Sequence, residues 1–584
     1  MMKKQKSTGI PYRSEKLSFK EFLKVFHNIS IPWLFLGIAF VSSVVNTYVT
    51  GINAGIQGNM LDESGTVPVA NVILYTVLTI VTMVTSAASL ILNNVSGEKI
   101  NLDMRKKIWR KIIAIGHKTL GVDEREQLVS RVTTDCDYSG TLFTSLASLI
   151  MAVVSFIIYT VQMAMINSQM TIASLIILPI TGILGGIYAA VMFKYTQKIQ
   201  GILSYMTSYL IEHVKNLTLI KTADMQKEET LEGERLFKAQ CNAQIRLGYV
   251  SSFYAALDQV YNIIIVIVPF VVGAVLYKDG LVTVAAVYTF YSLYGKVKTA
   301  CTSALTTMGS VNAAKGAMTK VRKTMDLPEE DLESGKRIEN EDQDITLDHV
   351  SFGFQPGTLV LKDVSCVIPA DKITAVIGGN GSGKSTVFKL IKRLYDPEQG
   401  QIFLGKEKAE EFNLREWRKA VCMVSPDNGF MIGTVRENIL FGCEREVGEE
   451  EFMNAVKITG VDDFVSILKD GYESKVTAGA MNFSGGQRQC MALARAVLSD
   501  AKVIMMDEAT SGLDAIREKA VLKEVCNYAG GRTILIIAYS ISAIQGADHV
   551  IVLRDGMVEA EGSADEIINR ENNYLTTMMS RYDG

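Results

Sequence analysis

The chain has 584 residues, with 59 Lys and Arg against 62 Asp and Glu, so its formal net charge is −3. This length exceeds one domain, and the balanced charge indicates no nucleic-acid partner. Apolar stretches concentrate in the first ~310 residues, in the pattern typical of transmembrane helices. The eight cysteines include no Cys-x-x-Cys pair. We therefore expect no metal cluster and no disulfide framework.

The N-terminal segment, residues 1–28, has no short apolar stretch followed by a small-residue cleavage site. The first apolar stretch is long enough to cross a bilayer, which predicts an uncleaved first helix rather than a signal peptide. Residues 18–28 combine charged and apolar side chains in an amphipathic pattern. They are interpreted either as an amphipathic helix on the inner membrane surface or as an extension of the first span.

Six segments are predicted to span a membrane. A spanning helix needs roughly 20 apolar residues, because each residue rises ~1.5 Å and the hydrocarbon is ~30 Å thick. The segments that satisfy this are 29–51, 68–93, 141–166, 169–193, 254–277 and 281–305. The two long loops, about 95–140 and 194–253, keep helical periodicity, so we expect the spans to continue beyond the bilayer as paired helices.

The charges of the loops predict the orientation. Lys and Arg gather in the N-terminal segment and in the loops after the second and fourth spans, whereas the stretch 51–70 contains neither. By the positive-inside rule, the basic side is cytoplasmic, so both termini are expected there in a multi-pass cell-membrane protein.

Several polar side chains fall within the predicted spans. Tyr288, Tyr291 and Tyr294 follow one another at intervals of three in the sixth span. Such a stripe either lines a cavity for an amphipathic molecule or packs against neighbouring helices. Asp258 and Lys296 are expected at similar depth, where they either pair with each other or meet a charged substrate.

An acidic, polar linker is predicted over residues 326–344, between a transmembrane domain over 29–325 and a second domain over 345–584. In the second domain, short apolar strands alternate with helical stretches, as in an α/β fold. The predicted fold class is therefore an all-α polytopic membrane domain followed by an α/β domain.

The ATPase prediction begins with a glycine-rich loop between a buried strand at 374–377 and a helix. Its glycines allow backbone N–H groups to surround phosphate oxygens, and the helix N-terminus adds positive potential. Lys384 would reach the β- and γ-phosphates, and the Ser385 hydroxyl would bind Mg²⁺. The expected ATP-binding residues of this loop are Gly379, Asn380, Gly381, Ser382, Gly383, Lys384, Ser385 and Thr386.

A second buried strand, at 503–506, ends in Asp507 and Glu508. Asp507 is predicted to hold Mg²⁺ through water. Glu508 is the candidate general base, because a carboxylate at this point can polarise the attacking water. The expected cofactors are therefore ATP and Mg²⁺.

Between these motifs stands Phe483-Ser484-Gly485-Gly486-Gln487, which resembles the signature of the ABC (ATP-binding cassette) family. Residues 345–584 resemble an ABC nucleotide-binding domain, and the whole chain is similar to a half-transporter of the type IV exporter fold. This resemblance implies that two such domains close head-to-tail on two ATP molecules. The signature residues Ser484, Gly485, Gly486 and Gln487 would then face the ATP held by the partner chain.

Further stretches extend the resemblance. Phe354 matches the aromatic residue that stacks on adenine, which is usually Tyr in the family. Residues 511–514 resemble the D-loop, and residues 216–222 resemble the second cytoplasmic loop just before a short coupling helix.

Two positions depart from the family. Pro426 stands where the family has the Q-loop glutamine, and proline has no side-chain donor or acceptor. Tyr539 replaces the switch histidine, and a phenol is uncharged at neutral pH. A milder change is Ala478, where an acidic residue is expected. The chain's own ATP site is therefore predicted to be degenerate, although the general base Glu508 is retained.

These features favour ATP-driven transport by a heterodimer, in which this chain pairs with a second, different ABC half-transporter. The alternatives are a homodimeric exporter of drugs, lipids or peptides that tolerates Pro426 and Tyr539, and an importer subunit for siderophores or other metallophores. A mainly regulatory, ATP-holding subunit is a further alternative.

Overall fold

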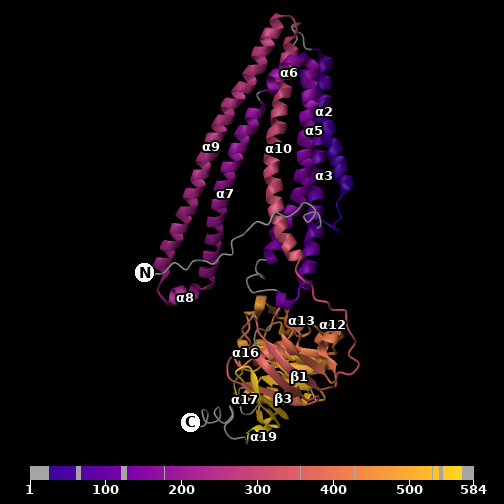
Figure 1. Ribbon diagram of the computed structural model, residues 1–584, viewed down its shortest axis with the longest axis vertical. Coiled ribbons are helices and arrows are strands. Elements are labelled where there is room, and N and C mark those ends of the chain that lie inside the picture. Colours follow the sequence, from indigo (N-terminus) through magenta and orange to yellow (C-terminus); the bar gives the residue numbers. More distant parts are fainter. Residues whose placement is uncertain are drawn as a thin grey trace. The chain divides into compact units, whose positions relative to one another are not determined.

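The structure is a computed structural model that describes residues 25–60, 68–119, 128–176, 178–355, 357–425, 429–513, 515–528, 530–537 and 544–568. The described residues divide into two compact units (Figure 1). Unit 1 lies within Met1–Ala114 and Val122–Leu327, and unit 2 lies within Ile115–Gly121 and Pro328–Gly584. A short segment that begins at Ile115 thus belongs to unit 2, although helices of unit 1 stand on either side of it in the chain.

The described part of unit 1 is built of helices. They are α2 (Trp33–Asn59), α3 (Val69–Ala114), α5 (Asp137–Ile166), α6 (Ser168–Leu175), α7 (Leu178–Lys215), α8 (Leu217–Thr222), α9 (Gln226–Lys278) and α10 (Val284–Met325). With 53 residues at ~1.5 Å per residue, α9 is far longer than the ~30 Å of hydrocarbon. The predicted continuation of the spans into long helices is confirmed. In Figure 1, α7 and α9 run side by side and α8 joins them.

Four helices of the described residues are long and apolar enough to cross a membrane. They cover Trp33–Asn59, Val69–Ala114, Leu128–Ile166 and Gln226–Lys278. These segments contain the predicted third and fifth spans and overlap most of the predicted first and second spans, which begin slightly earlier. The fourth predicted span falls on α6 and α7, and the sixth falls on α10. Those two remain predictions, since neither is among the helices that meet the same test.

The core of unit 1 gathers around α10. Phe290 and Tyr294 are fully buried there with Met163 and Met170. The Tyr294 hydroxyl donates to the carbonyl oxygen of Ser174 at 3.0 Å. Packing thus explains Tyr294. The tyrosine stripe has no single role, because three residues turn a helix by ~300° and its members drift around the axis.

The predicted amphipathic segment, 18–28, lies mostly outside the described residues. Its last part is packed rather than free, since Val25 and Phe26 are buried. The Phe26 ring meets Phe143 edge to face, with centroids 5.0 Å apart. The Lys107 ammonium donates to the carbonyl oxygen of Val25 at 3.0 Å.

Unit 2 has the predicted α/β fold. Two sheets make up most of its described strands. The antiparallel sheet has the order β2 (Leu361–Ile368), β1 (Ile345–Phe352), β4 (Gln399–Leu404), β5 (Glu407–Lys408). The larger sheet has the order β12 (Met557–Gly562), β11 (His549–Arg554), β3 (Ile373–Gly378), β10 (Thr533–Ile537), β9 (Val503–Met506), β6 (Val421–Val424). A short pair joins β7 (Gly433–Thr434) to β8 (Lys475–Val476).

The helices of unit 2 help to complete its apolar cores, two of which are large. The helices are α11 (Lys384–Ile391), α12 (Leu414–Ala420), α13 (Val435–Ile439), α14 (Glu449–Ile458), α15 (Asp462–Val465), α16 (Gly485–Leu498), α17 (Ala515–Tyr528) and α19 (Ala564–Ile568). One core lies between the two sheets around α11 and includes Phe388 and Trp417. The other surrounds α16 and includes Met491 and Leu493.

The parallel strands of the larger sheet decide where the polar motifs meet. Ile534 of β10 lies opposite both Ile373 of β3 and Ile504 of β9. Because β3, β10 and β9 run parallel and in register, their carboxyl ends share one edge of the sheet. Ligands of such folds bind beyond this edge.

Candidate functional site

The glycine-rich loop joins β3 to α11 at the carboxyl edge of the larger sheet. Gly381 and Gly383 have φ of 80° and 102°, which is left-handed backbone that favours glycine. A Cβ on Gly383 would also lie 2.4 Å from the Leu361 side chain. Residues Gly379, Asn380, Gly381 and Ser382 form the turn, and Lys384, Ser385 and Thr386 form the first turn of α11.

The lysine of this loop is buried. The Lys384 ammonium donates to the carbonyl oxygens of Gly378 and Gly379, both at 2.9 Å. Burial lowers the pKa of Lys384, and the nearby carboxylates of Asp507 and Glu508 act against this shift. An anion in the loop would compensate the buried ammonium, which fits a phosphate group.

Asp507 and Glu508 follow β9, which is separated by β10 from β3, the strand that precedes the loop. Asp507 is 3% exposed, and its Oδ1 atom has no hydrogen-bond partner among the described residues. Burial raises the pKa of Asp507, while a hydrogen bond with Ser385 acts to lower it. Hard oxygen ligands of this kind suit Mg²⁺, so Asp507 and Ser385 fit the metal they are expected to hold. Bound Mg²⁺ would neutralise phosphate charge.

Glu508 has a left-handed backbone, with φ of 53°. Such a conformation is strained for a residue with a side chain and persists only where the surroundings hold it. Gln489 of α16 supplies part of this support, because its amide N–H donates to the carbonyl oxygen of Glu508 and to Ser511 Oγ, both at 3.0 Å. Its amide oxygen accepts from the Gly512 N–H at 2.7 Å.

The signature stretch forms the N-terminus of α16. Ser484 is the N-cap: its hydroxyl accepts from the Gln487 N–H at 3.2 Å, and the Gln487 side chain accepts from the Ser484 N–H at 2.8 Å. This reciprocal capping box fixes the start of the helix. Phe483 is buried in the core, where Leu is usual in the family. A Cβ on Gly485 would meet no described atom within 4 Å, whereas one on Gly486 would lie 2.7 Å from the Gly512 carbonyl oxygen.

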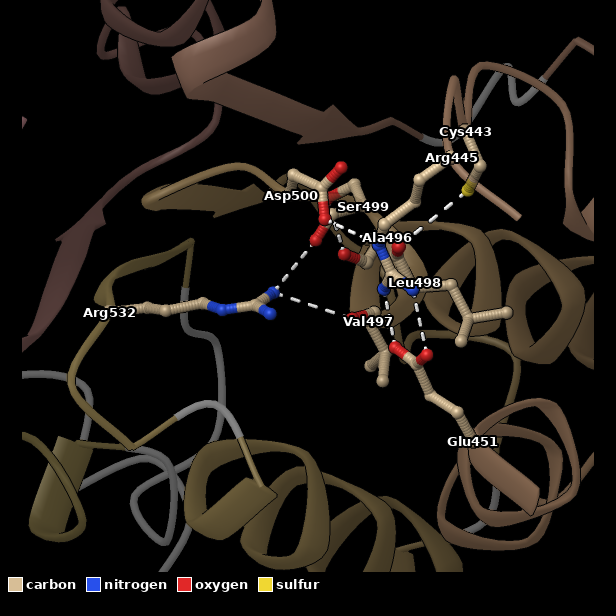
Figure 2. A network of polar contacts seen from close by, with 9 residues as sticks. All are labelled: Cys443, Arg445, Glu451, Ala496, Val497, Leu498, Ser499, Asp500 and Arg532. Carbon is tan, nitrogen blue, oxygen red and sulfur yellow. Dashed lines mark hydrogen bonds and ion pairs between the residues drawn. The ribbon is translucent and has the colours of Figure 1, made fainter. Parts of the chain in front are cut away.

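The other end of α16 is also held by side chains (Figure 2). Arg532 donates to the carbonyl oxygens of Val497 at 3.3 Å and Ser499 at 3.1 Å. The thiol of Cys443 donates to the Leu498 carbonyl oxygen at 3.6 Å. Arg445 joins Glu451 to Asp500 beside this end. Carbonyl groups that a helix leaves unpaired at its C-terminus are thus satisfied, partly by a cation that suits the helix dipole.

Phe354, the expected adenine-stacking residue, is half exposed at 49%. Its ring stands edge to face against Tyr395, with centroids 5.4 Å apart, and against Phe352 at 5.1 Å. The Lys389 ammonium lies 5.6 Å from the Phe354 centroid. These neighbours hold the Phe354 ring in place while about half of it stays exposed, as stacking on adenine would require.

The segment that begins at Ile115 reaches the same aromatic cluster. The rings of His117 and Tyr395 meet edge to face with centroids 5.5 Å apart. The His117 N–H donates to Glu330 Oε1 at 3.3 Å, and Glu330 forms a bidentate ion pair with Arg418. A stretch between α3 and α5 is thereby tied to the described ATPase residues.

Three of the expected features lie outside the described residues. They are Pro426, Tyr539 and Asp514, the last residue of the D-loop stretch. Ala478 is described and lies exposed in the short helical turn Ala478–Ala480. The coupling stretch also differs from expectation, because α8 occupies Leu217–Thr222 itself rather than the residues after it.

Sequence reasoning missed Gln489, Tyr395 and His117. Gln489 carried a usable signal, since it is a polar side chain next to the apolar run Cys490–Ala494 of α16 and is the one polar residue among the buried residues of that helix. Tyr395 and His117 carried none, because they are far from each other and from Phe354 in the chain, and only the fold brings the rings together.

Comparisons with known proteins agree with this geometry. A family model described as the ABC transporter transmembrane region matches residues 33–297, and one described as ABC transporter matches residues 361–511. The chain is 25% identical to a multidrug resistance ABC transporter ATP-binding and permease protein of Lactococcus lactis, over 95% of this chain and 94% of that protein. It is 27% identical to the mitochondrial potassium channel ATP-binding subunit of Mus musculus, over 89% of this chain and 72% of that one.

Both ABC regions stand in one chain, in the order and over the units described above. The helical unit makes it a multi-pass membrane protein. This chain therefore belongs to the ABC transporter family, as a half-transporter of the type IV fold that couples ATP hydrolysis to transport.

Proposed function

We propose that this half-transporter works in a heterodimer, with a weakly hydrolysing ATP site of its own and a signature that serves the site of its partner. The observation that carries the proposal is the pair of substitutions Pro426 and Tyr539. A proline cannot offer the amide of the family's glutamine, and a tyrosine cannot offer the charge of its histidine. Both changes affect only the site built on this chain's own phosphate loop.

The signature supports the second half of the proposal. Its capping box presents the helix N-terminus of α16, and Ser484 and Gly485 are exposed at that end. The helix is also held at its C-terminus, so its position is well defined. An exposed helix N-terminus, with open space beside Gly485, suits a phosphate group held by another subunit.

In this proposal the loop residues bind ATP on this chain. Lys384 contacts the β- and γ-phosphates, Ser385 and Asp507 hold Mg²⁺, Phe354 stacks on adenine, and Glu508 is placed as general base. With Tyr539 and Pro426 in place of the family's switch histidine and Q-loop glutamine, this site lacks two side chains that would position the water and the γ-phosphate. ATP then stays bound for long periods at this site, and the partner's site does most of the hydrolysis.

The same proposal places the ATPase unit in the cytoplasm and the protein in the cell membrane, on the distribution of Lys and Arg between the predicted loops. Closure of the paired ATPase units on ATP would switch the helices between inward- and outward-facing states.

One observation favours a homodimer instead. Glu508 is present, and the acidic pair with Asp507 is intact at the end of β9. A homodimer would contain two identical sites, so every substitution would affect both. The two arrangements consequently predict different rankings of variants.

The experiment compares two variants in the transporter purified from its native membrane. Gly485→Asp adds a charge at a position with free space, so it leaves the fold of this chain intact and repels the partner-held phosphate. Glu508→Gln removes the general base of the chain's own site. We expect ATP turnover to be abolished by Gly485→Asp and reduced only modestly by Glu508→Gln. Abolition of ATP turnover by Glu508→Gln as well would refute the asymmetric arrangement, because it would show that the site of this chain does the hydrolysis.

A further inference from the structure

Two cavities in unit 1 share one wall. The larger cavity, about 1080 Å³, lies among α7, α9 and α10, and the smaller cavity, about 440 Å³, lies among α2, α3, α5 and α10. Lys296 and Thr299 of α10 line both. Lys296 therefore stands where a ligand in either cavity reaches it.

The larger cavity already contains one satisfied ion pair. The Lys298 ammonium lies 3.2 Å from Asp258 Oδ1, and it also bonds to Asn262. Asn262 in turn donates to Asp258 Oδ2 at 3.2 Å. The expected pairing of Asp258 with Lys296 is thus wrong, because Lys298 takes that place.

Lys296 is the charged side chain of the cavity walls that the Lys298–Asp258 pair leaves over. It has no hydrogen bond or ion pair with any described residue, and Asp258 is the one acidic side chain that lines either cavity. It lies ~18 Å along α10 from Val284 at ~1.5 Å per residue, well within the depth of a bilayer. An ammonium at such depth is costly and usually marks a substrate site.

The other lining groups suit an amphipathic molecule. Tyr188 and Tyr254 stack in the larger cavity with centroids 3.7 Å apart. The smaller cavity has hydroxyl groups such as Ser43 and Ser89, and the amide oxygen of Asn93 is buried there without a described hydrogen-bond partner. An apolar body fits the first surface, and a polar headgroup fits the second.

We propose that these cavities bind an amphipathic organic anion, with Lys296 as the residue that selects its carboxylate, sulfate or phosphate headgroup. This inference rests on the proposed transport function and names the class of substrate. A lone cation beside a satisfied ion pair leaves the wall with excess positive charge, which attracts anions and disfavours cations.

The test is binding to the full-length protein in phosphatidylcholine nanodiscs, without ATP. The probes are dansylaminoundecanoate, which ends in a carboxylate, and the same dansyl-alkyl chain ending in trimethylammonium. We expect Lys296→Met to reduce the affinity for the carboxylate probe about tenfold or more, since hydrogen bonds to charged groups contribute on that scale. The trimethylammonium probe should not lose affinity, and Lys296→Arg should retain binding of the carboxylate.

Lys315→Met is the matched control, because Lys315 is exposed on the same helix and lines neither cavity. Equal weakening of both probes by Lys296→Met, or no weakening of the carboxylate probe, would overturn the proposal. Nanodiscs that contain phosphatidylglycerol distinguish the two sources of anion: competition with the probe indicates a lipid headgroup, and its absence indicates a free amphipathic anion. The binding test contains no ATP, so its result does not depend on ATP-driven transport. A failed transport assay would contradict the proposed transport function but not this binding proposal.

Discussion

Phe354 shows how a half-exposed ring gains a defined position from one near and one distant neighbour in the chain. It is half exposed, so its own burial cannot fix the ring. Tyr395 and Phe352 hold it in an edge-to-face cluster, and His117 contacts Tyr395 from the opposite part of the chain. A platform held in this way loses less side-chain freedom when a base stacks on it.

The substitution Tyr395→Ala tests this support. An aromatic pair contributes about 0.5–1.5 kcal/mol beyond its buried area, so the affinity for ATP should fall by about two- to tenfold. The measurement is equilibrium binding of a fluorescent ATP analogue to the full chain. Tyr395→Phe keeps the ring and should bind as the unchanged protein does. Equal affinity in Tyr395→Ala would show that Phe354 needs no such support.

Which single residues the sequence could predict depended on whether their neighbours are local. Lys384, Ser385, Asp507 and Glu508 lie in short contiguous motifs, and the parallel register of β3 and β9 brings these motifs together. The sequence could not show which of Lys296 and Lys298 pairs with Asp258. The two residues are ~200° apart around one helix, and the pairing depends on which side of that helix faces Asp258. Only the fold shows that Lys298 meets Asp258.

At the scale of the element, α16 is held at both ends, by a capping box at Ser484 and by Arg532 at its last carbonyl groups. Arg532→Gln removes the cation that suits the C-terminal end of the helix dipole. We expect the ATPase unit to lose about 1–2 kcal/mol of stability, on the scale of a charged hydrogen bond at a helix end.

Calorimetric melting of the full chain checks this expectation for Arg532→Gln. Arg554→Gln is the matched control, because the Arg554 side chain is 65% exposed and its ion pairs lie at the surface. The account of α16 would be wrong if both variants melted like the unchanged protein.

The pair α7 and α9 carries a pH-sensitive contact near α8. His213 Nε2 lies 2.8 Å from Glu229 Oε2, and the Tyr209 hydroxyl donates to the same oxygen at 2.8 Å. Burial acts to lower the pKa of His213, but hydrogen bonds to the Tyr209 carbonyl and Glu229 outweigh it, so the pKa is raised above 6.5. Glu212 adds to the rise.

A raised pKa means that the contact stabilises the helix pair fully below pH ~6.5, the ordinary value, and that this contribution is lost as the pH rises through the folded value. We therefore expect hydrogen exchange in Leu217–Thr222, after correction for intrinsic rates, to be slower at pH 6 than at pH 8. His213→Gln should remove this difference. A difference that persists in the variant would assign it to other groups.

The sequence predicted elements well where their pattern was strong. The long helices and the alternation of strands and helices in unit 2 follow from apolar periodicity. The apolar pattern of the fourth and sixth spans is weaker. In the sixth, α10 carries Lys296, Lys298 and several hydroxyl groups that reduce its hydropathy. Of these polar residues, Lys296 and Thr299 line both cavities.

At the scale of the whole molecule, the fold class was predictable because unit 1 has long apolar stretches and unit 2 has alternating strands and helices with a glycine-rich loop. The assignment of the segment at Ile115 to the ATPase unit was not, since nothing in its few residues points to Glu330 or Tyr395. The proposed pairing with a different subunit rests on Pro426 and Tyr539, which depart from the family's pattern.

The most direct test of that arrangement is Mg-ATP hydrolysis by this chain alone, purified in lipid nanodiscs, beside its Glu508→Gln variant. Because the proposed active site belongs to a different subunit, we predict negligible hydrolysis by both proteins. Robust hydrolysis by the unchanged chain that disappears in Glu508→Gln would contradict the account, because it would show a working homodimer with Pro426 and Tyr539 in active sites.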